Sequence, residues 1–146
     1  MVCVLIGAIS SLAIANLFVD HDDIARSEAR KLAKIIGELR EESLLSGRQM
    51  AIELDRAKDD DHYGYHFLIY QGQWQTVEDD VFSAQSFADG ISVSWQVEGK
   101  KSNIIVAEPI GLISDFKIVL TGHKQRYEVR VNDELKVVVE ERGKDD

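Results

Sequence analysis

Hydrophobic residues in the first third of the chain follow two patterns, one directly after the other. Residues 2–19 contain no charged side chain, and as a helix they would extend roughly 27 Å, close to the ~30 Å hydrocarbon core of a bilayer. Residues 24–46 are charged but keep apolar side chains at helical spacing. We therefore predict an apolar half-helix that continues into an amphipathic half. The acidic stretch 20–23 is where this helix would kink, and Gly47 would end it.

The amphipathic half has one apolar face, which is predicted to pack on the rest of the domain. Charged residues cover the remainder of this helix and are expected to face solvent. The residues predicted to face the core are Leu32, Ile35, Ile36 and Leu39.

After Gly47 the spacing of hydrophobic residues changes to the alternation that is typical of strands. The alternation is clearest at 91–98, whereas 103–107 is a continuous apolar run of the kind found in central strands. Strands and helices do not alternate along the sequence as they do in proteins with a parallel sheet. The predicted class is therefore α+β, with one long N-terminal helix and about eight short antiparallel strands. The segments expected to form strands are 50–54, 63–71, 73–77, 81–87 (the weakest), 91–98, 103–107, 116–120, 126–131 and 135–140.

The domain organisation follows from these patterns. Residues 1–20 are predicted to be the membrane half of the helix, and residues 21–146 a single domain. In that domain we expect the amphipathic helix at about 22–46, an antiparallel sheet at about 49–140 and a charged tail at 141–146.

Composition narrows the classes of partner. The net charge of −9 argues against a general nucleic-acid binder, which needs a basic face for phosphates. The single cysteine, Cys3, lies in the apolar segment and therefore cannot form an internal disulfide.

Candidate catalytic and metal-binding residues are few. His62 and His66 are four residues apart at the start of an expected strand, where they would be about 13 Å apart and unable to share a metal. The acidic loops at 59–61 and 78–80 leave calcium binding open, although neither has an EF-hand pattern. Nucleophile-elbow, P-loop and dinucleotide-binding motifs are missing from the sequence. We expect no enzymatic activity, no cofactor and no tightly bound metal.

One alternative explains the apolar segment as a cleaved signal peptide. The small residues Ala13 and Ala15 resemble a cleavage site. The chain would then be a secreted periplasmic β-rich binding protein that begins near Asn16. The apolar run continues through residues 17–19, which favours a membrane helix.

The order of apolar half-helix, amphipathic half-helix and antiparallel sheet resembles the type IV pilin superfamily. Within it, the chain is similar to minor pseudopilin H of type II secretion (general secretion pathway protein H) and to FimT-like minor pilins. Residues 4–9 (VLIGAI) resemble the apolar core of the family's N-terminal segment, and residues 39–49 (LREESLLSGRQ) the end of its helix. Pro109 and Gly111, followed by the strand at 116–120, resemble a family turn and strand.

The resemblance implies a pilin-like fold and a structural role. A minor pseudopilin of this kind joins the pseudopilus tip complex to the shaft, with a single pass through the bacterial inner membrane and a periplasmic globular domain. The implied partners are other minor pseudopilins, the major pseudopilin and inner-membrane lipid, with no nucleic acid. An alternative in the same superfamily is a minor pilin of a type IV pilus, active in fibre priming or DNA uptake. The residues implied to contact lipid and other subunits are Val4, Leu5, Ile9, Leu12, Ile14, Leu17 and Phe18.

Members of this family also begin with a short basic leader, a glycine and a Phe-Thr-Leu-Ile-Glu stretch. These features do not occur in the sequence given. We expect the genomic reading frame upstream of Met1 to encode them. Prepilin peptidase would then be a further partner, and methylation of the new N-terminus a further modification.

Overall fold

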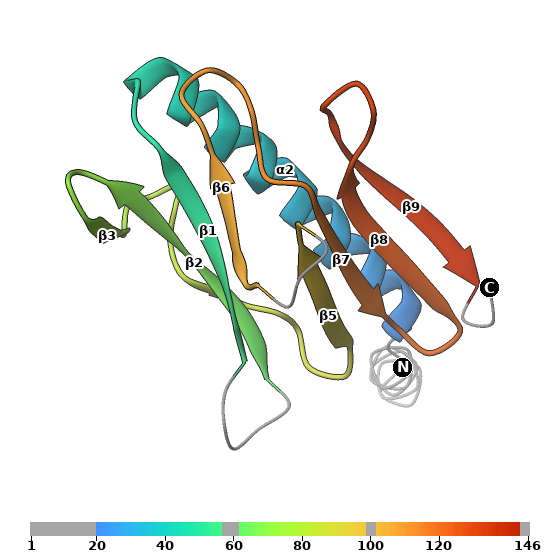
Figure 1. Cartoon of the computed structure of the whole chain (residues 1–146). Helices are drawn as coiled ribbons and strands as arrows, with labels where there is room; N and C mark the ends of the chain where they lie inside the picture. Colours follow the sequence, from blue (N-terminus) through green and yellow to red (C-terminus); the bar gives the residue numbers. More distant parts are fainter. Residues whose placement is uncertain (1–19, 57–61, 99–101, 144–146) are drawn as a thin grey trace, which may run out of the picture.

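The computed structural model describes residues 20–56, 62–98 and 102–143, in which one helix packs across two antiparallel sheets (Figure 1). The first sheet has the order β3-β2-β1-β6, with β4 also paired to β2, and the second has the order β5-β7-β8-β9. The class is therefore α+β, as predicted. The elements are α2 (His21–Ser46), β1 (Met50–Arg56), β2 (Tyr63–Tyr70), β3 (Trp74–Val77), β4 (Gln85–Ser86), β5 (Ser92–Val97), β6 (Ile104–Ala107), β7 (Phe116–Thr121), β8 (Gln125–Val131) and β9 (Val137–Gly143).

Both ends of α2 carry local signals that the sequence contains. Asp20 is extended and caps the helix, since its side chain accepts a hydrogen bond from the backbone N–H of Asp22. The described helix therefore begins directly after Asp20, inside the acidic stretch. Gly47 adopts the left-handed conformation (φ 69°), and its N–H donates to the carbonyl of Ser43, which closes the last turn.

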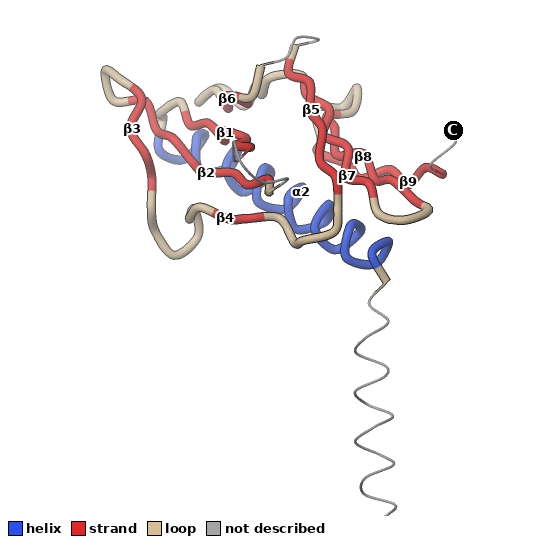
Figure 2. Tube along the Cα trace, turned by 90° about the horizontal axis from the view of Figure 1, so that it is seen from below, coloured by secondary structure: helices blue, strands red, loops and turns tan. Residues whose placement is uncertain are grey.

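Figure 2 shows α2 lying across both sheets, and a stripe of mostly apolar side chains attaches the helix to them. Leu32, Ile36 and Leu39 are fully buried. Ile35 is only partly buried, because its neighbour Ile36 occupies the centre of the stripe and successive helical residues are about 100° apart. The buried stripe of α2 consists of Ala25, Ala29, Leu32, Ile36, Leu39 and Ser43.

The two sheets share one core beneath this helix. The first sheet contributes Ile52 and Phe67, and the second contributes Ile118, Leu120 and Val129, all of them fully buried. Along β7, Ile118 and Leu120 alternate with exposed or half-exposed neighbours, as expected for a sheet with one buried face. A single core thus fixes where α2 lies relative to both sheets.

Three strand predictions need correction. The segment 81–87 forms only the two-residue strand β4. The side chain of Asp79 accepts hydrogen bonds from the backbone N–H groups of Val81 and Phe82, which holds the start of this segment in a turn. Leu135 lies in the β8–β9 turn with φ 60°, so the last strand begins at Val137. That strand continues to Gly143, so residues 141–143, which were predicted to belong to the charged tail, pair in register with β8.

Among the described residues, no helix is both long and apolar enough to cross a bilayer. The predicted membrane half of the helix, residues 2–19, lies outside the described ranges. The same holds for the acidic loop at 59–61 and for residues 144–146.

Candidate functional site

The base of α2 is joined to the second sheet by a single carboxylate. Oδ1 of Asp22 accepts hydrogen bonds from the backbone N–H groups of His123, Lys124 and Gln125, at 2.8, 2.9 and 3.0 Å. These donors, Gln125 first, lower the pKa of Asp22, because they favour its charged form. We call Asp22 and residues 122–125 the helix-base contact. It lies immediately after the apolar segment 2–19 in sequence.

Glycine is required at the centre of the helix-base contact. A Cβ atom added to Gly122 would lie 2.6 Å from Oδ1 of Asp22 and 2.8 Å from the carbonyl oxygen of His21. Both distances are below ordinary van der Waals contact, so a larger residue would push the β7–β8 turn away from α2. The close approach therefore fixes the orientation of the helix relative to the sheet at this end.

The opposite end of α2 is tied to the sheets by two polar side chains. Oγ of the buried Ser43 lies 3.0 Å from the carbonyl oxygen of Ala107 and 2.6 Å from that of Arg48. The guanidinium of Arg40 donates to the carbonyl of Gly111 at 2.7 Å and also to the carbonyl of Leu135. Three segments that are far apart in sequence therefore meet at this end.

Large apolar side chains are exposed around this meeting point. Leu45 is 84% exposed and Ile110 is 76% exposed, although both could have been polar without any effect on the core. Apolar residues gathered at one end of a domain mark a protein contact more often than singly scattered ones do. We call this set the far-end surface, and it consists of Leu44, Leu45, Ile110, Leu112 and Leu135.

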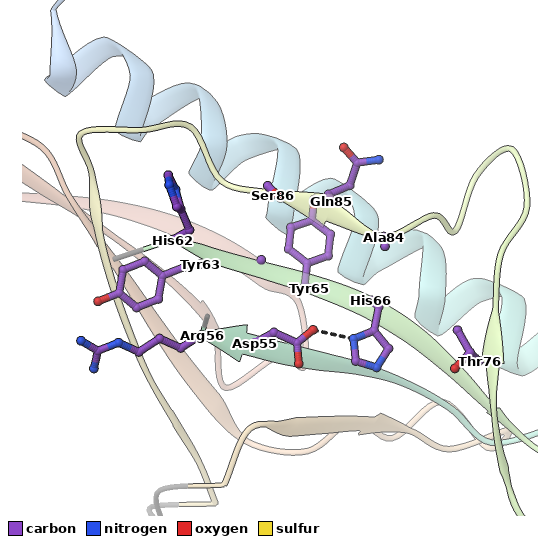
Figure 3. A pocket seen from close by; sticks show the side chains of 11 residues that line it. Asp55, Arg56, His62, Tyr63, Tyr65, His66, Thr76, Ala84, Gln85 and Ser86 are labelled. Carbon is purple, nitrogen blue, oxygen red and sulfur yellow. Dashed lines mark hydrogen bonds and ion pairs between the residues drawn. The ribbon is translucent and has the colours of Figure 1, made fainter. Parts of the chain in front are cut away.

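A cluster of one histidine and two carboxylates lies on the outer face of the first sheet, away from α2; Figure 3 shows two of its members, Asp55 and His66. Glu53 on β1 is directly opposite His66 on β2, and Asp55 is two residues further along β1, on the same face. Nδ1 of His66 is 2.6 Å from Oδ2 of Asp55, and its Nε2 is 3.1 Å from Oε1 of Glu53. The imidazole thus lies between two carboxylates, in a combination of side chains that metal ions bind.

Asp55 and His66 also line an open groove of about 520 Å³. His62 lines the same groove, but its Nδ1 contacts a different carboxylate, that of Asp89, at 3.0 Å. The two histidines therefore have separate partners, in line with the spacing predicted for a strand.

The cluster of Glu53, Asp55 and His66 was not predicted from the sequence. The alternation Glu53-x-Asp55 on a strand was the available signal, since it places two carboxylates on one face. What the sequence lacked was the register that sets His66 opposite them. The other acidic loop in view, residues 78–80, uses Oδ1 of Asp79 to accept from the N–H groups of Val81 and Phe82.

The residues expected to contact lipid and other subunits lie outside the described ranges. They are Val4, Leu5, Ile9, Leu12, Ile14, Leu17 and Phe18.

Comparison with known proteins identifies the fold. No protein-family model and no curated protein sequence matches the chain. Among solved structures, the minor pseudopilin EpsH from the type 2 secretion system of Vibrio cholerae matches with a TM-score of 0.66 and 16% sequence identity, over 80% of this chain and 95% of that one. A second crystal structure of EpsH matches with a TM-score of 0.65 and 15% identity, over 81% and 96% of the two chains.

The chain therefore has a minor-pseudopilin fold. This confirms the resemblance stated from the sequence at the level of the fold. The match extends over nearly all of EpsH, so it includes the helix and both sheets rather than a shared supersecondary motif.

Proposed function

We propose that this chain is a structural minor pseudopilin of a type II secretion system, which joins the tip complex of the pseudopilus to its shaft. The observation that carries the proposal is the match to EpsH over 95% of that chain. The charge-free segment 2–19 directly before α2 adds to it, because a pseudopilin needs an apolar half-helix at this position. EpsH is a structural protein, and the proposed role for this chain involves no catalysis.

In this role the apolar segment holds the protein in the inner membrane and later packs among other subunits of the filament. The residues proposed for these contacts are Val4, Leu5, Ile9, Leu12, Ile14, Leu17 and Phe18. The globular domain lies in the periplasm, and other minor pseudopilins and the major pseudopilin are its partners.

The two ends of α2 supply separate parts of this function. The helix-base contact holds the start of α2 against the second sheet, directly after the apolar segment in sequence, since Asp22 and Gly122 allow little movement there. The far-end surface offers apolar side chains to a subunit on the other side of the domain. A subunit between tip and shaft needs contacts at both ends, and this arrangement supports that position.

The experiment is co-purification of the full chain with the pseudopilins encoded beside it. Leu45→Asp combined with Ile110→Asp should abolish capture of at least one partner, because the two charges disrupt an apolar contact. Val81→Asp is the matched control, since Val81 is 55% exposed but lies outside the far-end surface.

Two results would contradict the proposal. Capture of type IV pilus subunits instead of pseudopilins would assign the chain to the pilus system. A cellular protein whose N-terminus, measured by mass spectrometry, begins near Asn16 would identify a secreted protein with a cleaved signal peptide.

A further inference from the structure

We propose that Glu53, Asp55 and His66 form a binding site for a divalent transition-metal ion, with Zn²⁺ as the probe. One ligand atom from each side chain can be chosen so that all three lie within 4.8 Å of one another. This site is on the outer face of the first sheet, whereas both ends of α2 serve the proposed assembly function. The spacing of the histidines along the sequence predicts no tight metal site, because it relates His62 and His66 only to each other.

The backbone places the three ligands without strain. The β1–β2 register sets Glu53 opposite His66 and puts Asp55 one pleat further along the same face. A tetrahedral zinc ion with bonds of about 2.0–2.1 Å holds its ligand atoms roughly 3.3–3.5 Å apart. The 2.6 Å distance runs from Nδ1 of His66 to Asp55 and the 3.1 Å distance from its Nε2 to Glu53, and one ion can bind only one of these two nitrogens. The carboxylate beside the other nitrogen would therefore have to rotate toward the ion, and ligand atoms of all three side chains already lie within 4.8 Å of one another.

The chemistry of the donors selects the class of metal. One imidazole nitrogen with carboxylate oxygens suits zinc and its neighbours, whereas calcium takes six to eight oxygen ligands. Two carboxylates also neutralise the charge of a divalent ion. Both Glu53 and Asp55 already form ion pairs with His66.

The site is open to solvent but not fully exposed. The side chain of His66 is 23% exposed and that of Glu53 is 28% exposed, so the sheet restricts both. Three protein ligands leave at least one coordination position on zinc free. Because Asp55 faces the groove, that position is available to water or to a donor group from another protein.

The test is calorimetric titration of the purified full chain with Zn²⁺. We expect one ion to bind per chain. His66→Gln should weaken binding at least roughly tenfold, and Asp55→Asn and Glu53→Gln should each weaken it by a similar factor. His62→Gln is the matched control and should bind zinc as the unsubstituted chain does, because His62 lines the same groove but contacts Asp89.

Three outcomes would overturn the proposal. The first is the absence of stoichiometric binding, which would leave His66 as the centre of a surface ion pair. The second is equal loss of affinity in His62→Gln and His66→Gln. The third is displacement of zinc by an equal concentration of Ca²⁺, which would indicate an acidic cluster without selectivity.

A spectroscopic measurement keeps the result independent of folding. Co²⁺ in place of zinc should give visible absorption bands that Asp55→Asn changes, while circular dichroism of the variant stays that of the unsubstituted chain. Unchanged bands would exclude Asp55 as a ligand. Neither titration depends on secretion or on other subunits, so failure of the metal site would leave the proposed function in place.

Discussion

The two ends of α2 are built on opposite principles. At the base, the carboxylate of Asp22 accepts three backbone hydrogen bonds. Gly122 lets the β7–β8 turn approach α2 so closely that there is no room for a Cβ atom. At the far end, Arg40 and Ser43 bind carbonyl groups of the neighbouring segments, and the apolar side chains around them remain exposed. The base is satisfied within the chain, whereas the far end leaves apolar side chains exposed to solvent. This difference suits the proposed role, in which α2 would connect a membrane segment to other subunits.

The middle of the helix should show the largest effect, because both ends depend on it. Leu32 is fully buried, so Leu32→Asp would place an unpaired charge in the core. We expect a loss of roughly 3 kcal/mol or more in the free energy of unfolding, measured by denaturant titration of the full chain. Lys31→Asp changes the exposed neighbour and should cost less than about 0.5 kcal/mol. Equal stability of the two variants would place the packing face elsewhere.

Breaking the base tests whether its close packing is essential. Gly122→Ala should lower the free energy of unfolding by about 1–3 kcal/mol, because the new methyl group overlaps Asp22 and His21. The same substitution at Gly37, where an added Cβ meets no atom within 4 Å, should raise it by about 0.5–1 kcal/mol. Thermal melting should show a lower melting temperature for Gly122→Ala and a higher one for Gly37→Ala than for the unsubstituted chain. A neutral Gly122→Ala would show that the β7–β8 turn moves freely.

The negative charge of Asp22 at the base of α2 should make the stability of the fold depend on pH. The pKa of Asp22 in the folded chain lies below its ordinary value of 3.8, so this residue stabilises the fold above that pH and loses its contribution as the pH falls below it. Asp22→Asn should therefore melt below the unsubstituted chain at pH 7, and the gap should narrow toward pH 3. Asp23→Asn, which affects only a surface ion pair with Arg26, is the control. A gap that is constant with pH would contradict the role of the charge.

Substitutions in the far-end surface should change the free energy of unfolding least. Leu45→Asp and Ile110→Asp change exposed side chains, so each should shift the free energy of unfolding by less than about 0.5 kcal/mol. Their effect should instead be seen in partner capture, as described above. A large loss of stability in either variant would make the far-end surface part of the core rather than a contact for another subunit.

The sequence alone determined the elements whose signals are local. The period of hydrophobic residues predicted α2, its core-facing residues and most of the strands, because side-chain burial repeats every 3.6 residues in a helix and every two in a strand. Gly47 marked the end of the helix for an equally local reason, since glycine readily takes the left-handed conformation. The order of these elements also carried the resemblance to pseudopilins that the fold confirms.

Tertiary structure alone decided which distant residues meet. Asp22 reads as one of several acids near a helix start, and only folding brings residues 123–125 to its carboxylate. His66 becomes the partner of Glu53 and Asp55 only through the β1–β2 register, which a one-residue slip would destroy. The charged end of β9 likewise joins the sheet because β8 is there to pair with it. Contacts of this kind depend on the alignment of separate segments, and no periodicity within one segment encodes that alignment.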